Sequence, residues 1–385
     1  MSHTRYDLII IGAGSVGVPT ALFCAKQGMK VLVLDKNRTA GQGEHKCAIG
    51  GIRATHSDPA KIRLTMASRD FFAAYRGRTG FDIHWRQGGY LYPAYTQPDA
   101  ELLQGTLAVQ QSLGLDNRWI DADAIDRLVP GIDRRDLLGG TYSPRDGSVS
   151  PIDTMAAYVR EALELGVTFL FDDPVQGFEI TYGKVSSVKS RSGAHASGYV
   201  VNAAGAWAAA VGALAGTALP IRPDMHEAGI TEPLQDFFDP MVVDIRREPG
   251  SANIYFYQNE IGQVVFCLTP DPALLGDDHR STSAFLPMVA KRLVKIFPRL
   301  ASARVRRVWR GLYPNTPDGS PIIDRDPTVE NLYHAVGMCG QGFMLGPGVG
   351  MLVARMVTNN LERDDAMVLA ALTLKRPFGG AELLT

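Results

Sequence analysis

The chain has 385 residues, of which 45% are hydrophobic and 21% charged, so it can bury a sizeable core and divide into two or three domains. Its 39 basic and 40 acidic residues nearly cancel, which excludes the basic surface of a nucleic-acid-binding protein. The apolar runs are of strand length, no signal-type segment opens the chain, and the four cysteines form no C-x-x-C pair. We therefore expect a reduced, cytoplasmic protein without a membrane span.

The first elements follow the pattern of a dinucleotide-binding unit. A buried strand over residues 6–11 runs directly into the glycine-rich turn 12–17. A helix over 19–27 and a second strand over 30–34 follow, and that strand ends at Asp35. Strand, glycine-rich turn, helix, strand and acid in this order predict a nucleotide cofactor.

The residues of this turn have separate physical tasks. Gly12 permits the tight turn, Gly14 lets a pyrophosphate approach the backbone, and Gly17 lets the helix pack on the strand. The start of the helix presents free N–H groups and the positive end of its dipole to the phosphates. Asp35 is spaced to bind a ribose hydroxyl, and an acid there argues against a 2′-phosphate. This motif alone leaves both FAD and NAD open.

The rest of the chain alternates helices and strands without an internal repeat or a clear linker. Helices are expected over 60–75, 100–113, 121–129, 151–166 and 284–297. Strands are expected over 85–92, 167–171, 176–180, 184–190, 304–310 and 332–336, and an antiparallel sheet over 226–231, 241–245, 254–258 and 263–268.

Two later segments are rich in small residues. The strand within 198–207 ends in small residues before an alanine-rich helix, which suits a backbone close to a ligand, although tight packing alone would also explain it. The strand 332–336 runs into the glycine-rich segment 337–343, and 346–350 is expected to open a helix that reaches about residue 361. The N-terminus of that helix would be a second binding site for an anion, unless the glycines only pack against the first strand.

Together these segments resemble the FAD-dependent amine oxidoreductases of the D-amino-acid oxidase (DAO) superfamily. The resemblance rests on residues 12–17 with Asp35, on 201–207, on 317–323, and on 337–343 with 346–350. Within the superfamily, the segments 47–53, 225–233 and 309–318 look most like those of sarcosine oxidase β subunits and the β subunit of dye-linked L-proline dehydrogenase.

The resemblance implies FAD and an α/β fold. A Rossmann-like FAD-binding domain would be built from the discontinuous segments 1–84, 150–218 and 305–385. A second α+β domain, 85–149 and 219–304, would place an antiparallel sheet over the flavin ring and bind the substrate.

The resemblance also assigns cofactor-binding residues. They are Gly12, Gly14, Ser15, Val16, Gly17, Asp35, Lys36, Cys47, Ala48, Gly51, Ala204, Gly205, Trp207, Gly311, Gly340, Gly342, Phe343 and Met344. Some relatives attach flavin through a cysteine, and Gly311 stands at the corresponding place here, so we expect non-covalent FAD. Cys47 is interpreted as a small packing residue, although Cys47 and His45 both lie in the flavin-side loop, which leaves covalent attachment through either residue open.

Three residues are expected to carry the chemistry. Arg53 resembles a flavin-side arginine that could bind a substrate carboxylate or tune the flavin, with a surface ion pair as the alternative. His226 falls on the strand that would cover the flavin and could act as a base, or could be a hydrogen-bonded core residue. Tyr255 could bind substrate or His226, and Tyr257 shares its face, so either tyrosine, or neither, could line the pocket. Met344 stands where monomeric sarcosine oxidases carry a carboxylate-binding lysine, and this departure weakens a sarcosine assignment.

The leading hypothesis is therefore an enzyme that oxidises a secondary amine or amino acid, such as proline, hydroxyproline, sarcosine or an opine, by hydride transfer to flavin N5. A dehydrogenase of a 2-hydroxy acid or of glycerol phosphate, a primary-amine oxidase, and a non-catalytic FAD-holding subunit are the alternatives. The partners would be a small amine, an electron acceptor (oxygen, a dye or quinone, or a partner subunit), and further chains if this one is a β-type subunit of a hetero-oligomer.

Overall fold

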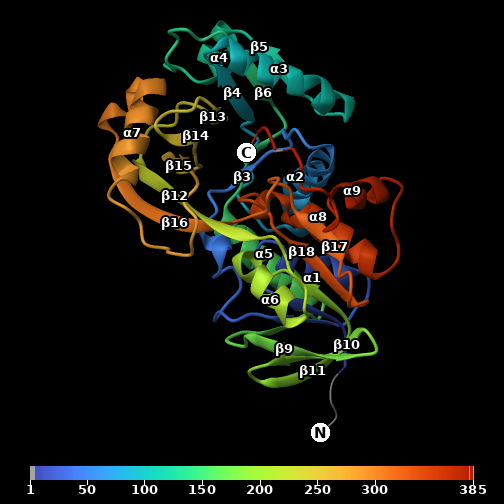
Figure 1. The fold of residues 1–385 in the computed structure, drawn as a ribbon. Coiled ribbons are helices and arrows are strands. Elements are labelled where there is room, and N and C mark those ends of the chain that lie inside the picture. Colours follow the sequence, from blue (N-terminus) through green and yellow to red (C-terminus); the bar gives the residue numbers. More distant parts are fainter. Residues whose placement is uncertain (1–4, 381, 385) are drawn as a thin grey trace.

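A computed structural model describes residues 5–380 and 382–384, and it contains two large sheets (Figure 1). In the first sheet the strand order is β17 (Ile322–Arg325), β18 (Leu332–Val336), β11 (Gly193–Asn202), β1 (Tyr6–Ile11), β2 (Val31–Leu34) and β8 (Thr168–Leu170), with β10 (Lys184–Ser190) and β9 (Val175–Thr181) extending from β11. The strands from β18 to β8 are parallel, whereas β17 runs antiparallel to β18. We call it the parallel sheet.

The second sheet, which we call the roof sheet, lies beside α7 in Figure 1. Its order is β16 (Val305–Asn315), β12 (Arg222–Pro233), β15 (Gln263–Asp271), β14 (Gly250–Gln258), β13 (Met241–Asp244), β4 (Tyr90–Ala94), β6 (Gly139–Ser143) and β5 (Arg118–Ile120). Neighbours are antiparallel except β13 and β4, which are parallel. The short strands β3 (Gly51–Ile52) and β7 (Gly147–Ser148) form a separate pair.

The helices cover these sheets and connect them. They are α1 (Gly17–Lys26), α2 (Pro59–Thr79), α3 (Gln97–Ser112), α4 (Ala122–Leu128), α5 (Pro151–Glu164), α6 (Ala208–Leu214), α7 (Phe285–Ile296), α8 (Gly342–Val357) and α9 (Asp365–Ala371), with 3-10 turns η1 (Glu44–Cys47), η2 (Gly205–Trp207) and η3 (Pro298–Ser302). Local sequence explains several boundaries. Asp58 caps α2 by accepting from the N–H of Ala60, Pro59 starts the helix, and Gly80 ends it in the left-handed region.

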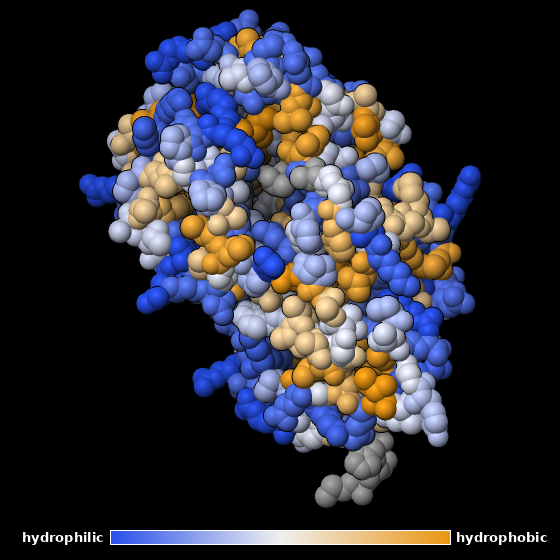
Figure 2. Space-filling view, in the orientation of Figure 1, coloured by the Kyte–Doolittle hydropathy of each residue, from blue (hydrophilic) through white to orange (hydrophobic). Residues whose placement is uncertain are grey.

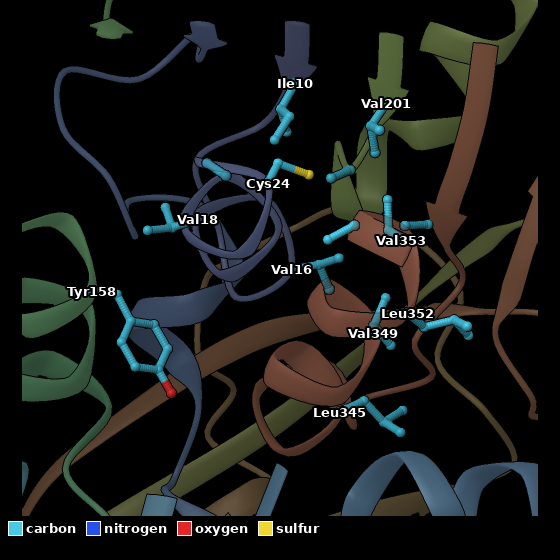
Figure 3. Packing of buried hydrophobic residues seen from close by; sticks show 14 of the residues in the cluster. Ile10, Val16, Val18, Cys24, Tyr158, Val201, Leu345, Val349, Leu352 and Val353 are labelled. Atoms are coloured by element: carbon cyan, nitrogen blue, oxygen red, sulfur yellow. The ribbon is translucent and has the colours of Figure 1, made fainter. Parts of the chain in front are cut away.

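The largest core lies between the parallel sheet and helices α1, α2, α5 and α8. Figure 3 shows side chains of β1 and β11, such as Ile10 and Val201, close to Val349 and Val353 of α8. A Cβ atom at Gly346 would stand 2.0 Å from the carbonyl oxygen of Ser15, so only glycine lets α8 approach α1 this closely. This contact fixes the positions of both helix N-termini.

Three expectations need correction. The strand expected over 85–92 is confined to β4, because only Arg86 forms a bridge within the segment before it. The glycine run 346–350 lies inside α8, which begins four residues earlier, at Gly342. The second sheet is not wholly antiparallel, because β13 pairs in parallel with β4. The domain limits stay a prediction; residues 305–315, which that prediction assigns to the FAD-binding domain, form β16 of the roof sheet.

On the face drawn in Figure 2, hydrophilic residues dominate the rim and hydrophobic residues form small separate groups. Within residues 5–380 and 382–384, no helix is both long enough and apolar enough to cross a bilayer.

Candidate active site

A cavity of about 490 Å³ runs from the glycine-rich turn after β1 to the roof sheet. All of the predicted site residues except Gly17 line it. They come from segments as distant in sequence as η1 and α8, so the fold gathers the predicted set at one place. Gly17 has a different task, because a Cβ atom there would stand 1.8 Å from the carbonyl oxygen of Gly12 and would force the helix off the strand.

The turn between β1 and α1 leaves room for a ligand. Gly12 has a φ of +109°, which favours glycine, and its N–H donates to the carbonyl of Leu34 (2.8 Å). A Cβ atom at Gly14 would meet nothing within 4 Å, although Gly14 lines the cavity. The turn therefore borders an open space beside the N-terminus of α1, which is the site that a pyrophosphate needs.

Asp35 is held at the end of β2 by the same turn. Its Oδ2 accepts from the backbone N–H of Ala13 (2.6 Å), and its Oδ1 accepts from the backbone N–H of Asn37 (2.7 Å). The ammonium group of Lys36 lies 3.2 Å from the ring centroid of Trp207, and both residues line the cavity. An aromatic platform beside an acid at this edge suits the adenosine end of a dinucleotide.

His45 connects η1 to the glycine-rich turn. Its Nδ1 lies 2.9 Å from Ser15 Oγ and its Nε2 lies 2.7 Å from the carbonyl oxygen of Pro151. Burial lowers the pKa of His45 to about 4, so the ring is neutral at neutral pH. Because the Pro151 carbonyl can only accept, Nε2 carries the proton, and Nδ1 accepts from the Ser15 hydroxyl.

A second helix N-terminus faces the cavity from α8. The first residues of this helix, Gly342, Phe343 and Met344, all line the cavity, whereas Gly346, Gly348 and Gly350 are packing residues. Cβ atoms at these three glycines would stand 2.0 to 2.9 Å from backbone atoms of Ser15, Leu64, Pro19 and Thr20. The glycine run thus packs α8 against other helices, and the free N–H groups lie at Gly342–Met344.

Cys47 and Gly311 are neighbours across the cavity wall. A Cβ atom at Gly311 would stand 2.7 Å from Cys47 Cβ, so Cys47 fills the space that a larger residue at 311 would take. Its Sγ lies 3.4 Å from the carbonyl oxygen of Arg310, and burial raises the pKa of the thiol to about 11. The sulfur is therefore a protonated thiol at neutral pH, and non-covalent FAD stays a prediction.

The roof sheet contributes a connected group of polar side chains. His226 Nε2 lies 3.0 Å from Asp224 Oδ2, its ring stacks on Tyr313 at 3.7 Å between centroids, and its Nδ1 is buried without a hydrogen-bond partner among the described residues. The hydroxyls of Tyr313 and Tyr255 are 2.7 Å apart. Burial raises the pKa of both tyrosines well above the usual value, so both hydroxyls are available as donors.

Tyr255 and Tyr257 differ in their surroundings. Tyr255 lines the cavity, whereas the Tyr257 hydroxyl donates to the carbonyl of Ile49, and Tyr257 is absent from the cavity wall. Of the two tyrosines left open by strand alternation, the geometry favours Tyr255.

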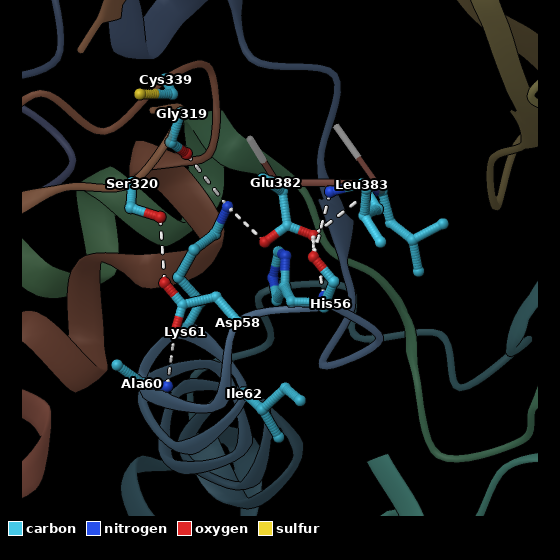
Figure 4. Close-up of polar contacts among 12 residues, drawn as sticks. His56, Asp58, Ala60, Lys61, Ile62, Gly319, Ser320, Cys339, Glu382 and Leu383 are labelled. Atoms are coloured by element: carbon cyan, nitrogen blue, oxygen red, sulfur yellow. Dashed lines mark hydrogen bonds and ion pairs between the residues drawn. The ribbon is translucent and has the colours of Figure 1, made fainter. Parts of the chain in front are cut away.

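Arg53 is buried and borders the cavity, so it forms no surface ion pair. Its guanidinium donates to the carbonyls of Thr55 and Leu384, and its Nη1 lies 3.2 Å from His56 Nδ1. Figure 4 shows the adjoining network, in which Lys61 forms a 3.1 Å ion pair with Glu382. The segment 382–384 thus helps to hold Arg53, and its carbonyl contacts leave fewer guanidinium N–H groups for a substrate.

Several residues of this site were not among the predicted set. Tyr313, Asp224, Cys267, Glu44 and Gln341 either line the cavity or hold a residue that does. Tyr313 lies two residues beyond Gly311 on the same strand and therefore on the same face, so strand alternation was a usable signal for it. Asp224 and His226 likewise share a face, but nothing in the sequence indicates that Gln341 points into the cavity.

The described residues fit a dinucleotide such as FAD. The N-termini of α1 and α8 border the cavity and could bind phosphate and ring oxygens, and the carboxylate of Asp35 could bind a ribose hydroxyl. The space beside Gly14 is open and would be filled by any side chain at that position. Within the described chain, no group of three or more His, Cys, Asp or Glu residues could hold a metal ion.

Comparisons with known proteins agree with this geometry. A family model described as DAO, FAD dependent oxidoreductase, matches residues 7–356. The chain is 27% identical to glycine oxidase of Geobacillus kaustophilus over 98% of this chain and 99% of that protein. It is also 27% identical to sarcosine oxidase subunit beta of an Arthrobacter species, over 95% and 89%. The crystal structure of L-proline dehydrogenase from P. horikoshii is similar with a TM-score of 0.89, at 30% identity over 97% of this chain and 98% of that one.

Proposed function

Because the chain belongs to the DAO family of FAD-dependent oxidoreductases and acts on CH–NH bonds of amino acids or amines, we propose that its substrate is a secondary amino acid or an N-substituted glycine. The names of two of the similar proteins support this class, since sarcosine and L-proline are secondary amino acids, whereas glycine, named in the third, is a primary one. When bound, FAD supplies the acceptor for the hydride that leaves the substrate carbon, at ring N5.

The observation that carries the proposal is the neutral hydrogen-bonding group on the roof sheet. The hydroxyls of Tyr255 and Tyr313 bond to one another, and both also contact the Cys267 thiol, so the remaining tyrosine O–H can donate either to that sulfur or to a substrate carboxylate. Arg53 also lines this cavity, and its positive charge would attract a substrate carboxylate. Two backbone carbonyls already accept hydrogen bonds from part of its guanidinium. One carboxylate suits this set, whereas a phosphate dianion would need a cluster of cations, so glycerol phosphate is not favoured.

His226 is the proposed proton acceptor. An amine must lose its ammonium proton before its lone pair can support the forming imine, and the Nδ1 of His226 has no hydrogen-bond partner among the described residues. Asp224 accepts from Nε2–H, which keeps the lone pair on Nδ1. The aromatic and small residues that line this part of the cavity, among them Tyr92, Ala228 and Val243, would surround the substituent on nitrogen.

The test is an anaerobic titration of the purified protein while the visible flavin band is followed. L-Proline, D-proline, hydroxyproline, sarcosine, N-methylated and opine-type amino acids are compared with glycine, D-alanine and 2-hydroxy acids. Bleaching by a secondary amine and not by a 2-hydroxy acid supports the proposal. Bleaching by 2-hydroxy acids alone, or by glycine and D-alanine alone, refutes it.

We also propose that the chain works with a partner that takes up its electrons, because it is similar to sarcosine oxidase beta subunits from several bacteria. If substrate bleaches the flavin but oxygen restores the colour slowly, a dye or a partner chain is the acceptor. Rapid recovery in air would instead identify an oxidase that needs no partner.

A further inference from the structure

The loop between β18 and α8 carries a buried amide that the reaction described above does not use. Gln341 is 6% exposed and lines the cavity, and its Oε1 is buried without a hydrogen-bond partner among the described residues. A buried amide oxygen without a partner destabilises the fold, so an amide in this state on a cavity wall points to hydrogen bonding with a ligand that the cavity binds.

The backbone around Gln341 is firmly held, so the free amide is not a consequence of a loose loop. Its N–H donates to the carbonyl of Met338 (2.8 Å), and its own carbonyl accepts from the N–H of Leu345 (2.9 Å) as the cap of α8. The side chain is therefore presented to the cavity from a fixed position at the N-terminus of a 16-residue helix.

The neighbours of Gln341 place it between two parts of the cavity. On one side, a Cβ atom at Gly340 would stand 2.2 Å from the ring of Tyr313, which belongs to the roof sheet. On the other side, a Cβ atom at Gly342 would stand 4.0 Å from Ser15 Cβ, which belongs to the glycine-rich turn 12–17. Gln341 thus lies where the glycine-rich turn meets the roof sheet.

We propose that the side-chain amide of Gln341 binds the flavin half of FAD, through the ribityl hydroxyls or the carbonyl and N–H groups of the pyrimidine ring. These groups both donate and accept hydrogen bonds, as an amide does. The proposal concerns cofactor binding and holds whichever amine is oxidised.

The test uses Gln341→Met, which keeps the length of the side chain and removes the amide. The release of FAD from the holoenzyme on dilution is followed by flavin fluorescence and gives the dissociation constant of FAD. Competition by ADP, corrected for the FAD affinity of each variant, gives the affinity for the adenosine half alone. The dissociation constant for a bleaching amine is measured by anaerobic titration.

We expect Gln341→Met to weaken FAD binding about 3- to 10-fold, which corresponds to one or two neutral hydrogen bonds, and to shift the visible flavin band. ADP affinity should stay within twofold. The matched control is Gln258→Met, because Gln258 is also buried, but its amide donates to the carbonyls of Gln235 and Gly262 and it does not line the cavity. This control should lower the unfolding temperature and leave FAD affinity unchanged.

Three results would overturn the proposal. FAD affinity within twofold of the parent would show that the amide does not bind the cofactor. An equal loss of FAD and ADP affinity would assign the effect to the adenosine half or to the loop. An unchanged FAD affinity with weaker amine binding would assign the amide to the substrate. If Gln341→Met does not fold, Gln341→Asn shortens the reach by one methylene, and the same comparison applies to it.

Discussion

The neutral, buried ring of His45 predicts a specific loss of stability in acid. Its pKa of about 4 in the folded protein lies below the ordinary value of 6.5. Between these values the unfolded chain binds a proton that the folded protein does not, so stability falls as the pH is lowered from about 7 towards 4. The perturbation that isolates this effect is His45→Asn, which removes the titrating ring.

The size of the effect follows from the difference in pKa. A shift of about 2.5 units corresponds to about 3 kcal/mol once the pH is below both values. At pH 5 the loss should be about 2 kcal/mol relative to pH 8. At pH 8, His45→Asn should cost about 1–3 kcal/mol, because the contacts with Ser15 and the Pro151 carbonyl are lost. The two proteins should therefore approach equal stability near pH 5.

The assay is chemical unfolding of both proteins at several pH values between 8 and 5, with FAD in excess. Other groups, such as the buried His56, titrate in both proteins and cancel in the difference. The difference in the free energy of unfolding between the parent protein and His45→Asn, which we call the stability gap, should shrink by about 2 kcal/mol as the pH falls from 8 to 5. A gap that stays constant within about 0.5 kcal/mol over this range would refute a neutral His45 and the tautomer assigned to it.

Three further perturbations have defined outcomes. Glu382→Gln should destabilise the protein by about 3–5 kcal/mol in chemical unfolding, because it leaves the fully buried ammonium of Lys61 without its counter-charge. Adding Lys61→Met should recover part of this loss, and equal stability of the single and double variants would contradict the prediction. Gly346→Val should prevent α8 from packing on α1, because its Cβ atom would stand 2.0 Å from the Ser15 carbonyl oxygen. The purified protein should therefore lose its yellow flavin, and a normal FAD content would contradict this prediction. Tyr255→Phe should raise the dissociation constant of the amino acid about tenfold in anaerobic titration, while FAD affinity stays unchanged. An unchanged amino-acid affinity would show that this hydroxyl does not bind the substrate.

The cofactor half of the site could be predicted because its signals are local. The turn at Gly12–Gly17, its strand and helix, and the acid at Asp35 lie within one short stretch of sequence, and the structure brings them together on one cavity. Backbone conformation and close helix packing require glycine at fixed positions, so the chain itself carries that information.

The substrate half depended on contacts between distant segments. His226, Tyr255 and Tyr313 come from β12, β14 and β16, and only the pairing of those strands in the roof sheet brings the three rings together. The start of α8 was misplaced because its internal glycines resemble a loop in sequence, whereas tight packing against α1 and α2 requires them within a helix.

Arg53 shows the same division most clearly. The sequence by itself placed Arg53 at the end of the segment 47–53, and the resemblance of that segment to a flavin-side loop implied that Arg53 binds a carboxylate or tunes the flavin. Only the tertiary structure decided its partners, because the carbonyl of Leu384, 331 residues away along the chain, reaches its guanidinium. Local sequence fixes which backbone conformations are allowed, but the hydrogen bonds of a buried charge depend on every segment that packs around it.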